Sequence, residues 1–187
     1  MESTKADDSP VYQLKVTLKG SKPPIWRRIQ VRGNTTLAKL HGIIQTAMGW
    51  TDSHLHQFTI DGVSYGTPDP DGELELKSER RVKLGQLVAR GKARFRYEYD
   101  FGDSWDHEIE VEQILPPEPG VRYPVCLAGK LACPPEDCGG IWGYVEFLEA
   151  IGNPEHEEHE AMLEWVGGAF APEAFDLVAV NRLLQQR

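Results

Sequence analysis

Three cysteines and one histidine are the residues of this chain whose types most directly suggest metal chemistry. Cys126, Cys133 and Cys138 share one Pro/Gly-rich stretch. Thiolates are good ligands for zinc, and a structural zinc site needs four donors. His107 lies in a preceding alternating segment and is the nearest imidazole before that stretch. The pattern therefore predicts a zinc site formed by Cys126, Cys133, Cys138 and His107.

The cysteine spacing leaves alternatives open, because it is not that of a CxxC pair. His56, His156 or His159 could replace His107 as the fourth donor. The cysteines could instead be small buried residues around a turn, or have a redox or disulfide role. Three clustered cysteines are too few for a disulfide framework.

The segment from Asp100 to His107 combines carboxylates, aromatic rings and an imidazole. A carboxylate beside His107 would suit proton transfer near neutral pH. The structural alternative is that His107 packs on an apolar face and that Asp103 serves a tight turn. We expect this segment and the Pro/Gly-rich loop over residues 115–140 (the cysteine loop) to border one polar pocket. Its predicted residues are His56, Asp103, Trp105, Glu136 and Asp137.

Hydrolytic chemistry is an alternative use of the same residues. Cys138 precedes a predicted helix, where the helix dipole would stabilise a thiolate. Cys138, with His107 as base and Asp103 or Asp137 as the third member, would form a cysteine-dependent hydrolase. A metal-dependent hydrolase is the other form of this alternative. No complete catalytic set is evident from the sequence, so a non-enzymatic binding module is the first expectation.

The net charge of −9 conceals an uneven distribution. Residues 1–96 carry 16 Lys/Arg and 10 Asp/Glu, whereas residues 97–187 carry 4 and 19. Trp26, Arg27, Arg28 and Arg32 fall on one predicted strand and resemble a stacking platform with phosphate-neutralising charges. These four residues predict a nucleic-acid-binding face. The alternatives are a solvated surface or docking of the acidic half of the chain.

Hydrophobic periodicity predicts an α+β domain. Residues 12–18 and 25–32 alternate as two strands, and residues 37–48 show helical spacing between an N-cap in 34–36 and Gly49. Residues 94–101 and 105–112 form a hairpin in which Tyr99 faces Trp105 and Tyr97 faces His107. A long loop over residues 115–140 precedes helices at 141–151, 154–166 and 172–184. Together they predict a mixed, mostly antiparallel sheet with an N-terminal strand-strand-helix unit, a central β-hairpin and C-terminal helices.

We expect a flexible N-terminal tail at residues 1–10 and one domain over residues 11–187. The tail is polar and contains no apolar run, so no signal peptide is predicted there. No stretch approaches the length of a membrane helix. These features predict a cytoplasmic protein without a membrane partner.

Several motifs of the chain occur together. They are Pro24-Ile-Trp-Arg-Arg28, Leu40-His41, Met48-Gly-Trp50, His54-Leu-His56-Gln-Phe58, Tyr99-Asp-Phe-Gly-Asp-Ser-Trp-Asp-His107, Ala132-Cys-Pro-Pro-Glu-Asp-Cys-Gly-Gly140 and Trp142-Gly-Tyr144. Over about Val11 to Leu184 the chain resembles the plasmid pRiA4b ORF-three-like family. The resemblance implies a single α+β domain, often carried on plasmids or near mobile elements, without an established activity.

Some members of that family carry a transposon-passenger, TnpR-like label, which suggests a resolvase. Serine recombination needs an activated serine near the N-terminus, but the first strand has Thr17 and no serine. Tyrosine recombination needs a late tyrosine, and none follows Tyr144. A recombinase is therefore not expected.

Overall fold

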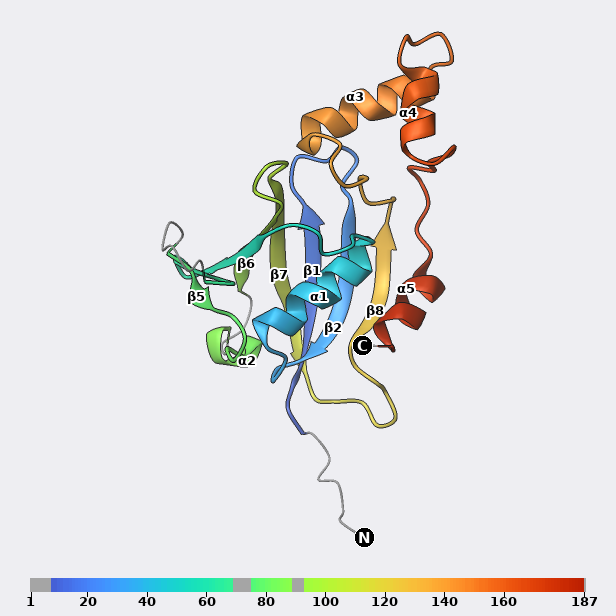
Figure 1. Cartoon of the computed structure of the whole chain (residues 1–187). Coiled ribbons are helices and arrows are strands. Elements are labelled where there is room, and N and C mark those ends of the chain that lie inside the picture. The colour runs from blue at the N-terminus through green and yellow to red at the C-terminus, as the bar shows by residue number, and fades with distance from the viewer. Residues whose placement is uncertain (1–7, 69–74, 89–92, 187) are drawn as a thin grey trace.

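The chain folds around one mixed eight-stranded sheet (Figure 1). The computed structural model describes residues 8–68, 75–88 and 93–186, so residues 1–7 of the predicted tail lie outside it. The strands are β1 (Val11–Leu18), β2 (Trp26–Arg32), β3 (His56–Ile60), β4 (Val63–Gly66), β5 (Lys77–Ser78), β6 (Arg94–Tyr99), β7 (Trp105–Leu115) and β8 (Val125–Lys130). The helices are α1 (Leu37–Met48), α2 (Leu84–Leu87), α3 (Gly140–Gly152), α4 (His159–Trp165) and α5 (Leu177–Leu184). The α+β prediction is confirmed.

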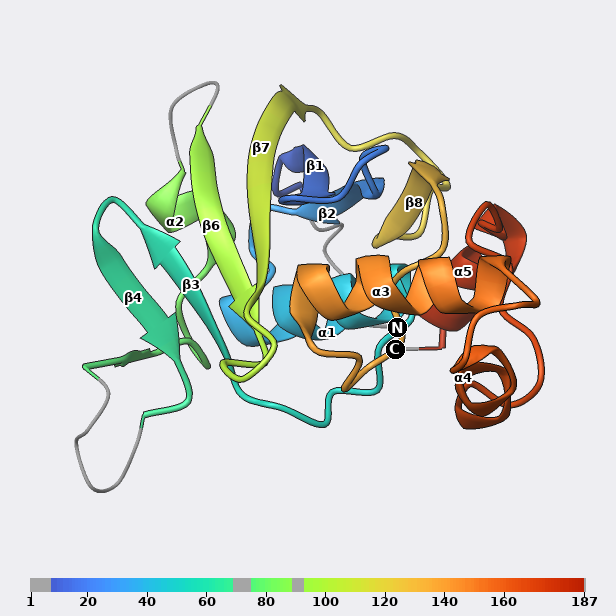
Figure 2. The ribbon, with the colours of Figure 1, turned by 90° about the horizontal axis from the view of Figure 1, so that it is seen from above.

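The strands lie in the order β5-β4-β3-β6-β7-β1-β2-β8. Every pair is antiparallel except β4 with β5. Helix α1 crosses one face of β1 and β2, α3 lies over one end of the sheet, and α5 lies beside β8 (Figures 1 and 2). Among the described residues, no helix is both long and apolar enough to cross a membrane.

Helix α1 begins and ends where the sequence predicts. The Thr36 side chain accepts a hydrogen bond from the Lys39 backbone N–H at 3.3 Å, which satisfies one donor of the first turn. Gly49 ends the helix with φ of 104°, a left-handed conformation that glycine adopts without steric cost. The apolar stripe of α1 packs on the inner face of β1 and β2 and forms part of the core.

The hairpin of β6 and β7 has the predicted register. Tyr99 faces Trp105 and Tyr97 faces His107, so the aromatic rings and the imidazole share the buried face. On the exposed face Arg94 pairs with both Glu108 and Glu110. Arg96, which faces Glu108 in the backbone register, bonds the carboxylate of Asp106 diagonally at 2.6 Å.

Part of the predicted 115–140 loop is a strand. β7 continues to Leu115, and β8 adds an edge strand that pairs with β2. β8 pairs on one side only, and its segment is short and contains Gly129, so its own sequence gives a weak strand signal. A Cβ at Gly129 would collide with the side chains of Phe175 and Arg27, which explains a glycine there.

Arg27 corrects the predicted nucleic-acid face, because it points into the protein. Its side chain is buried, with the residue only 2% exposed. The guanidinium donates hydrogen bonds to the backbone carbonyls of Trp26, Ala47, Lys130 and Leu131. Arg27 therefore ties β2 to the C-terminal end of α1 and to the chain that follows β8.

The other members of that predicted face already have protein partners. The Arg28 guanidinium donates two hydrogen bonds to Glu112, at 2.6 and 2.8 Å. It also lies 5.2 Å from the centre of the Trp26 ring. Arg32 lies over the Tyr123 ring at 4.9 Å. The Glu112 carboxylate offsets the charge of Arg28, so less positive charge is left on this face for a phosphate backbone.

Arg27→Met should destabilise the fold far more than Arg28→Met. The first substitution leaves buried carbonyl oxygens without donors, and the expected loss is about 3 kcal/mol or more in the free energy of unfolding. Arg28→Met removes a partly exposed ion pair, with an expected loss of about 1 kcal/mol or less. Urea denaturation of both variants measures the difference, and equal losses would contradict the structural role of Arg27.

Candidate functional site

The hydroxyl group of Tyr99 joins three segments at one end of the sheet. Tyr99 is the last residue of β6, and its hydroxyl accepts a hydrogen bond from the Ser53 backbone N–H at 3.0 Å. The same hydroxyl donates to the carboxylate of Glu136 in the cysteine loop. Burial and the Glu136 carboxylate raise the pKa of Tyr99, so the hydroxyl keeps its proton and remains a donor. The residues that follow Ser53, Tyr99 and Glu136 in the sequence are His54, Asp100 and Asp137, respectively.

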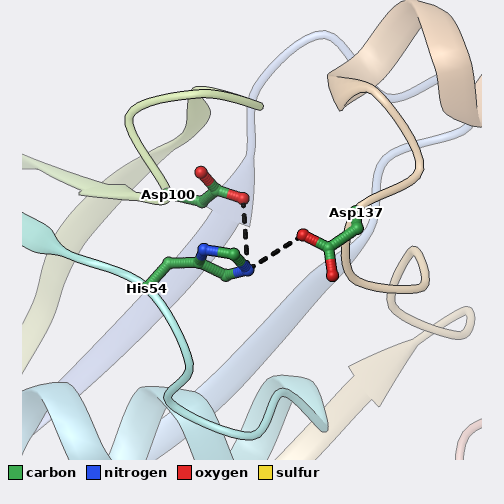
Figure 3. Close-up of side chains that lie close together, drawn as sticks. All are labelled: His54, Asp100 and Asp137. Carbon is green, nitrogen blue, oxygen red and sulfur yellow. Dashed lines mark ion pairs between the residues drawn. The ribbon is translucent and has the colours of Figure 1, made fainter.

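Those three residues converge on one point (Figure 3). His54 Nε2 lies 3.0 Å from Asp137 Oδ1 and 3.6 Å from Asp100 Oδ2. One donor atom from each residue lies within 4.8 Å of the other two. The Asp100 side chain is largely buried, whereas that of Asp137 is 70% exposed. The set therefore opens to solvent on the side of the cysteine loop.

The Asp100 carboxylate is held by its own turn. Its Oδ1 accepts hydrogen bonds from the backbone N–H groups of Gly102 and Asp103, at 2.9 and 3.3 Å. Its backbone N–H donates to the carbonyl of Leu55 at 2.8 Å, which attaches the segment after His54 to the end of β6. Oδ1 therefore serves the turn, while Oδ2 faces His54.

Left-handed backbone conformations gather around the three side chains. Asp52, Asp100 and Asp137 have φ of 60°, 58° and 59°, and Ser104 has 55°. Non-glycine residues adopt this region at a cost, although aspartate tolerates it better than most. Such strain persists where surrounding contacts enforce it, and it concentrates at functional sites.

Residues 50–56 are anchored by buried His41 and half-buried His56. The His41 and His56 rings stack with centroids 3.4 Å apart. His41 Nε2 lies 2.6 Å from Asp52 Oδ1, and His56 Nε2 lies 2.9 Å from the buried Glu79 carboxylate. Burial, reinforced by the neighbouring His56 ring, lowers the pKa of His41. These contacts hold the chain on both sides of His54.

The cysteine loop is anchored to the same end of the sheet. Trp50 Nε1 donates to the Pro134 carbonyl at 3.1 Å, and Thr51 donates to the Glu136 carboxylate. The Gly139 backbone N–H donates to Asp103 Oδ2 at 3.1 Å. Gly140 has φ of 69°, and a Cβ there would collide with the Asp103 carbonyl oxygen. The two glycines thus allow the hairpin turn and the loop to touch.

The four predicted zinc ligands do not come together. No three of the donor atoms of Cys126, Cys133, Cys138 and His107 lie within 4.8 Å of one another; among the described residues only His54, Asp100 and Asp137 form such a group. Cys126 is buried in β8, where its thiol lies 3.5 Å from the Ala128 carbonyl. His107 is fully buried in the core, and its Nδ1 lies 3.3 Å from the Tyr97 carbonyl. The structural interpretation of His107, that it packs on the apolar face, is the one that fits.

The thiols are also poorly placed for nucleophilic chemistry. Burial raises the pKa of Cys138 to about 12, and the nearby Asp103 carboxylate acts in the same direction. Burial also raises the pKa of Cys133 and of Cys126. A nucleophilic cysteine needs the opposite shift.

The predicted pocket residues divide into two groups. Asp103, Glu136 and Asp137 do lie where the hairpin turn meets the cysteine loop. Trp105 is fully buried beneath Trp50, with ring centroids 5.8 Å apart, and His56 pairs with Glu79. Trp105 and His56 therefore support the neighbouring segments and do not line the site.

His54 and Asp100 are the converging residues that the sequence does not predict as part of a site. Both lie in the motifs that carry the family resemblance, but neither belongs to a metal-ligand spacing. Their one sequence signal is a polar residue close to a β-strand end: His54 lies two residues before β3, and Asp100 follows the last residue of β6. Convergence of three distant segments cannot be read from spacing within any one of them.

Comparisons with known proteins agree with the fold. The family model described as Plasmid pRiA4b ORF-3-like protein matches residues 10–179. An uncharacterized protein of Sinorhizobium fredii, y4hQ, is 42% identical over 172 residues, which is 91% of this chain and 86% of that protein. The crystal structure of MM3350 from Methanosarcina mazei, a protein of unknown function, superposes with a TM-score of 0.82 at 45% identity. It covers 91% of this chain and 97% of that one.

His107 should make the protein less stable in mild acid. Burial lowers the pKa of His107 from 6.5 to about 4, so between these values the unfolded chain binds more protons than the folded one. The contribution is complete above pH 6.5 and is lost as the pH falls through 4, by about 3 kcal/mol in total. Denaturant unfolding at pH 7 and pH 4 measures it.

His107→Leu is the matched comparison, because leucine is apolar and cannot titrate. Its stability should fall about 3 kcal/mol less than that of the wild type over the same interval. If the two proteins lose stability in parallel, the buried neutral histidine is not the cause.

Proposed function

We propose that this chain, which belongs to the plasmid pRiA4b ORF-3-like family, is a binding protein that holds a divalent metal ion with His54, Asp100 and Asp137. The observation that carries this proposal is the convergence of an imidazole nitrogen and two carboxylate oxygens from three segments. An association with plasmids or mobile elements, expected from the family, stays a prediction.

The separations between the donor atoms suit a shared ion. Ligands about 2.1 Å from one metal lie roughly 3.0–3.4 Å apart in octahedral or tetrahedral geometry. His54 Nε2 is 3.0 and 3.6 Å from its two carboxylate partners. Small side-chain rotations would therefore complete the coordination without moving the backbone.

His54 Nε2 also lacks a hydrogen bond in the described part of the chain. The atom is buried, and the nearby carboxylate oxygens do not lie in a direction that gives a hydrogen bond. A buried polar atom without a partner is costly, and native proteins rarely leave one. A metal ion bound to Nε2 would satisfy it.

Three protein ligands leave coordination positions free. Structural zinc sites use four protein ligands, whereas sites that bind a water or substrate keep one or more positions open. Because the Asp137 side chain is 70% exposed, a free position on a bound ion would face solvent. We therefore infer a site that presents the ion to a ligand, with zinc as the ion that best suits one imidazole and two carboxylates.

Three alternatives receive different support. Metal-dependent hydrolysis is compatible with the open positions, because a bound zinc ion makes hydroxide available near neutral pH. Cysteine-dependent hydrolysis has little support because of the raised pKa of Cys138. The nucleic-acid alternative is weakened by the burial of Arg27 and by the pairing of Arg28 with Glu112.

Calorimetric titration of metal-free protein with Zn²⁺, Mn²⁺ and Mg²⁺ tests the proposal. We expect one zinc ion per chain, and His54→Gln should weaken zinc binding by more than about 100-fold, because it removes a direct ligand. His156→Gln is the matched control, since the half-buried His156 lies in the turn between α3 and α4, outside the site. Absence of saturable zinc binding, or equal effects of the two substitutions, would refute the metal site.

Tyr99→Phe should weaken zinc binding by about tenfold without removing a ligand. The hydroxyl positions Ser53 and Glu136, each next to a ligand. Tyr97→Phe is the control, because Tyr97 lies in the same strand as Tyr99. Its hydroxyl also has buried partners, His41 and Gln45 of α1. A loss of zinc affinity that is the same in both variants would show a general effect of destabilisation.

A further inference from the structure

A cavity lies beside Asp137, between α3 and α4. Its volume is about 310 Å³, and Asp137 forms one side of it. The cavity is therefore a neighbour of the metal site, but its other lining residues come from the C-terminal helices. The residues that give it its chemistry are Asp137, Glu146, Phe147, Glu158, Met162 and Trp165.

The walls of the cavity are aromatic and apolar. Phe147 is buried and contacts Trp165 edge to face, with ring centroids 5.7 Å apart. Trp165 remains 46% exposed although it is the largest apolar side chain of α4. A half-exposed indole that lines a cavity offers both apolar contact and a ring face that attracts cations.

The charged groups of the cavity all have the same sign. Asp137, Glu146 and Glu158 contribute three carboxylates, and no lysine, arginine or histidine lines the cavity. Within the described part of the chain, neither Glu146 nor Glu158 forms an ion pair. A cation is therefore the complementary ligand.

We propose that this cavity binds a primary alkylammonium group of the kind carried by a lysine side chain. The methylene stem would lie against Phe147, Met162 and Trp165, and the ammonium would face the carboxylates that line the same cavity. The volume is at the lower limit for small-molecule pockets, which suits one side chain better than a larger ligand. The inference goes beyond the metal site and does not depend on it, because only Asp137 is shared.

Binding of a capped lysine to metal-free protein tests this inference. The probe is Nα-acetyl-lysine N-methylamide, and its matched analogue is Nα-acetyl-norleucine N-methylamide, which lacks the ammonium. In a titration followed by NMR, we expect the lysine probe to bind at least about tenfold more tightly and to shift the Trp165 indole signal. Equal affinities for the two probes, or shifts confined to other regions, would overturn the proposal.

Two pairs of variants separate this cavity from general negative charge. Glu158→Gln and Trp165→Leu should each weaken lysine binding by about threefold to tenfold. Their controls are Glu157→Gln, one residue away and outside the lining, and Trp142→Leu, whose side chain is exposed on the other side of α3. The fold of each variant is checked by circular dichroism. Glu158→Gln alters only an exposed side chain. If controls and cavity variants behave alike, the binding is not at this cavity.

The result is independent of the metal site. The titration uses protein without metal, so failure of zinc binding leaves the expected lysine affinity unchanged. Failure of lysine binding in turn leaves His54 and Asp100 unaffected. The two sets of measurements therefore distinguish an incorrect metal site from an incorrect ammonium site.

Discussion

The hydroxyl group of Tyr99 joins the three segments that form the candidate site. Tyr99 stands at the end of a central strand and bonds Ser53 on one side and Glu136 on the other. Each of these residues precedes a side chain of the candidate site, so the two bonds of this oxygen atom hold three distant segments together. The bonds from Trp50 and Thr51 to the cysteine loop reinforce them. The raised pKa of Tyr99 keeps its proton in place, so this connection does not titrate near neutral pH.

The rest of the fold supplies rigid supports for that connection. The β6–β7 hairpin buries Tyr97, Tyr99, Trp105 and His107 on one face, and Trp50 packs against them from the chain after α1. Arg27 performs a similar role at the other side of the sheet, where it joins β2, α1 and the start of the cysteine loop through backbone carbonyls. Sites held by packed elements of this kind keep their geometry better than sites on free loops. The loops at this site are therefore short spans between fixed points.

The sequence predicts the local parts of this arrangement and misses the distant ones. The hairpin register follows from alternation on both faces, and Thr36 and Gly49 mark the ends of α1, since each signal lies within one segment. β8 is missed because an edge strand pairs on only one side, and Arg27 is misplaced because its charge outweighs its inward position in the alternation.

The sequence does predict that the hairpin turn meets the cysteine loop. It assigns the chemistry to Cys126, Cys133, Cys138 and His107, whereas the converging donors are His54, Asp100 and Asp137. Backbone contacts between segments decide which side chains face each other, and spacing within a segment does not record them.

Zinc X-ray absorption spectroscopy of the loaded protein tests the central claim most directly, because it identifies the atoms bound to the ion. The account predicts a shell of nitrogen and oxygen neighbours at about 2.0–2.2 Å, with imidazole scattering from one histidine and no sulfur. A shell containing sulfur at about 2.3 Å would place the ion on the cysteines and contradict the site described above.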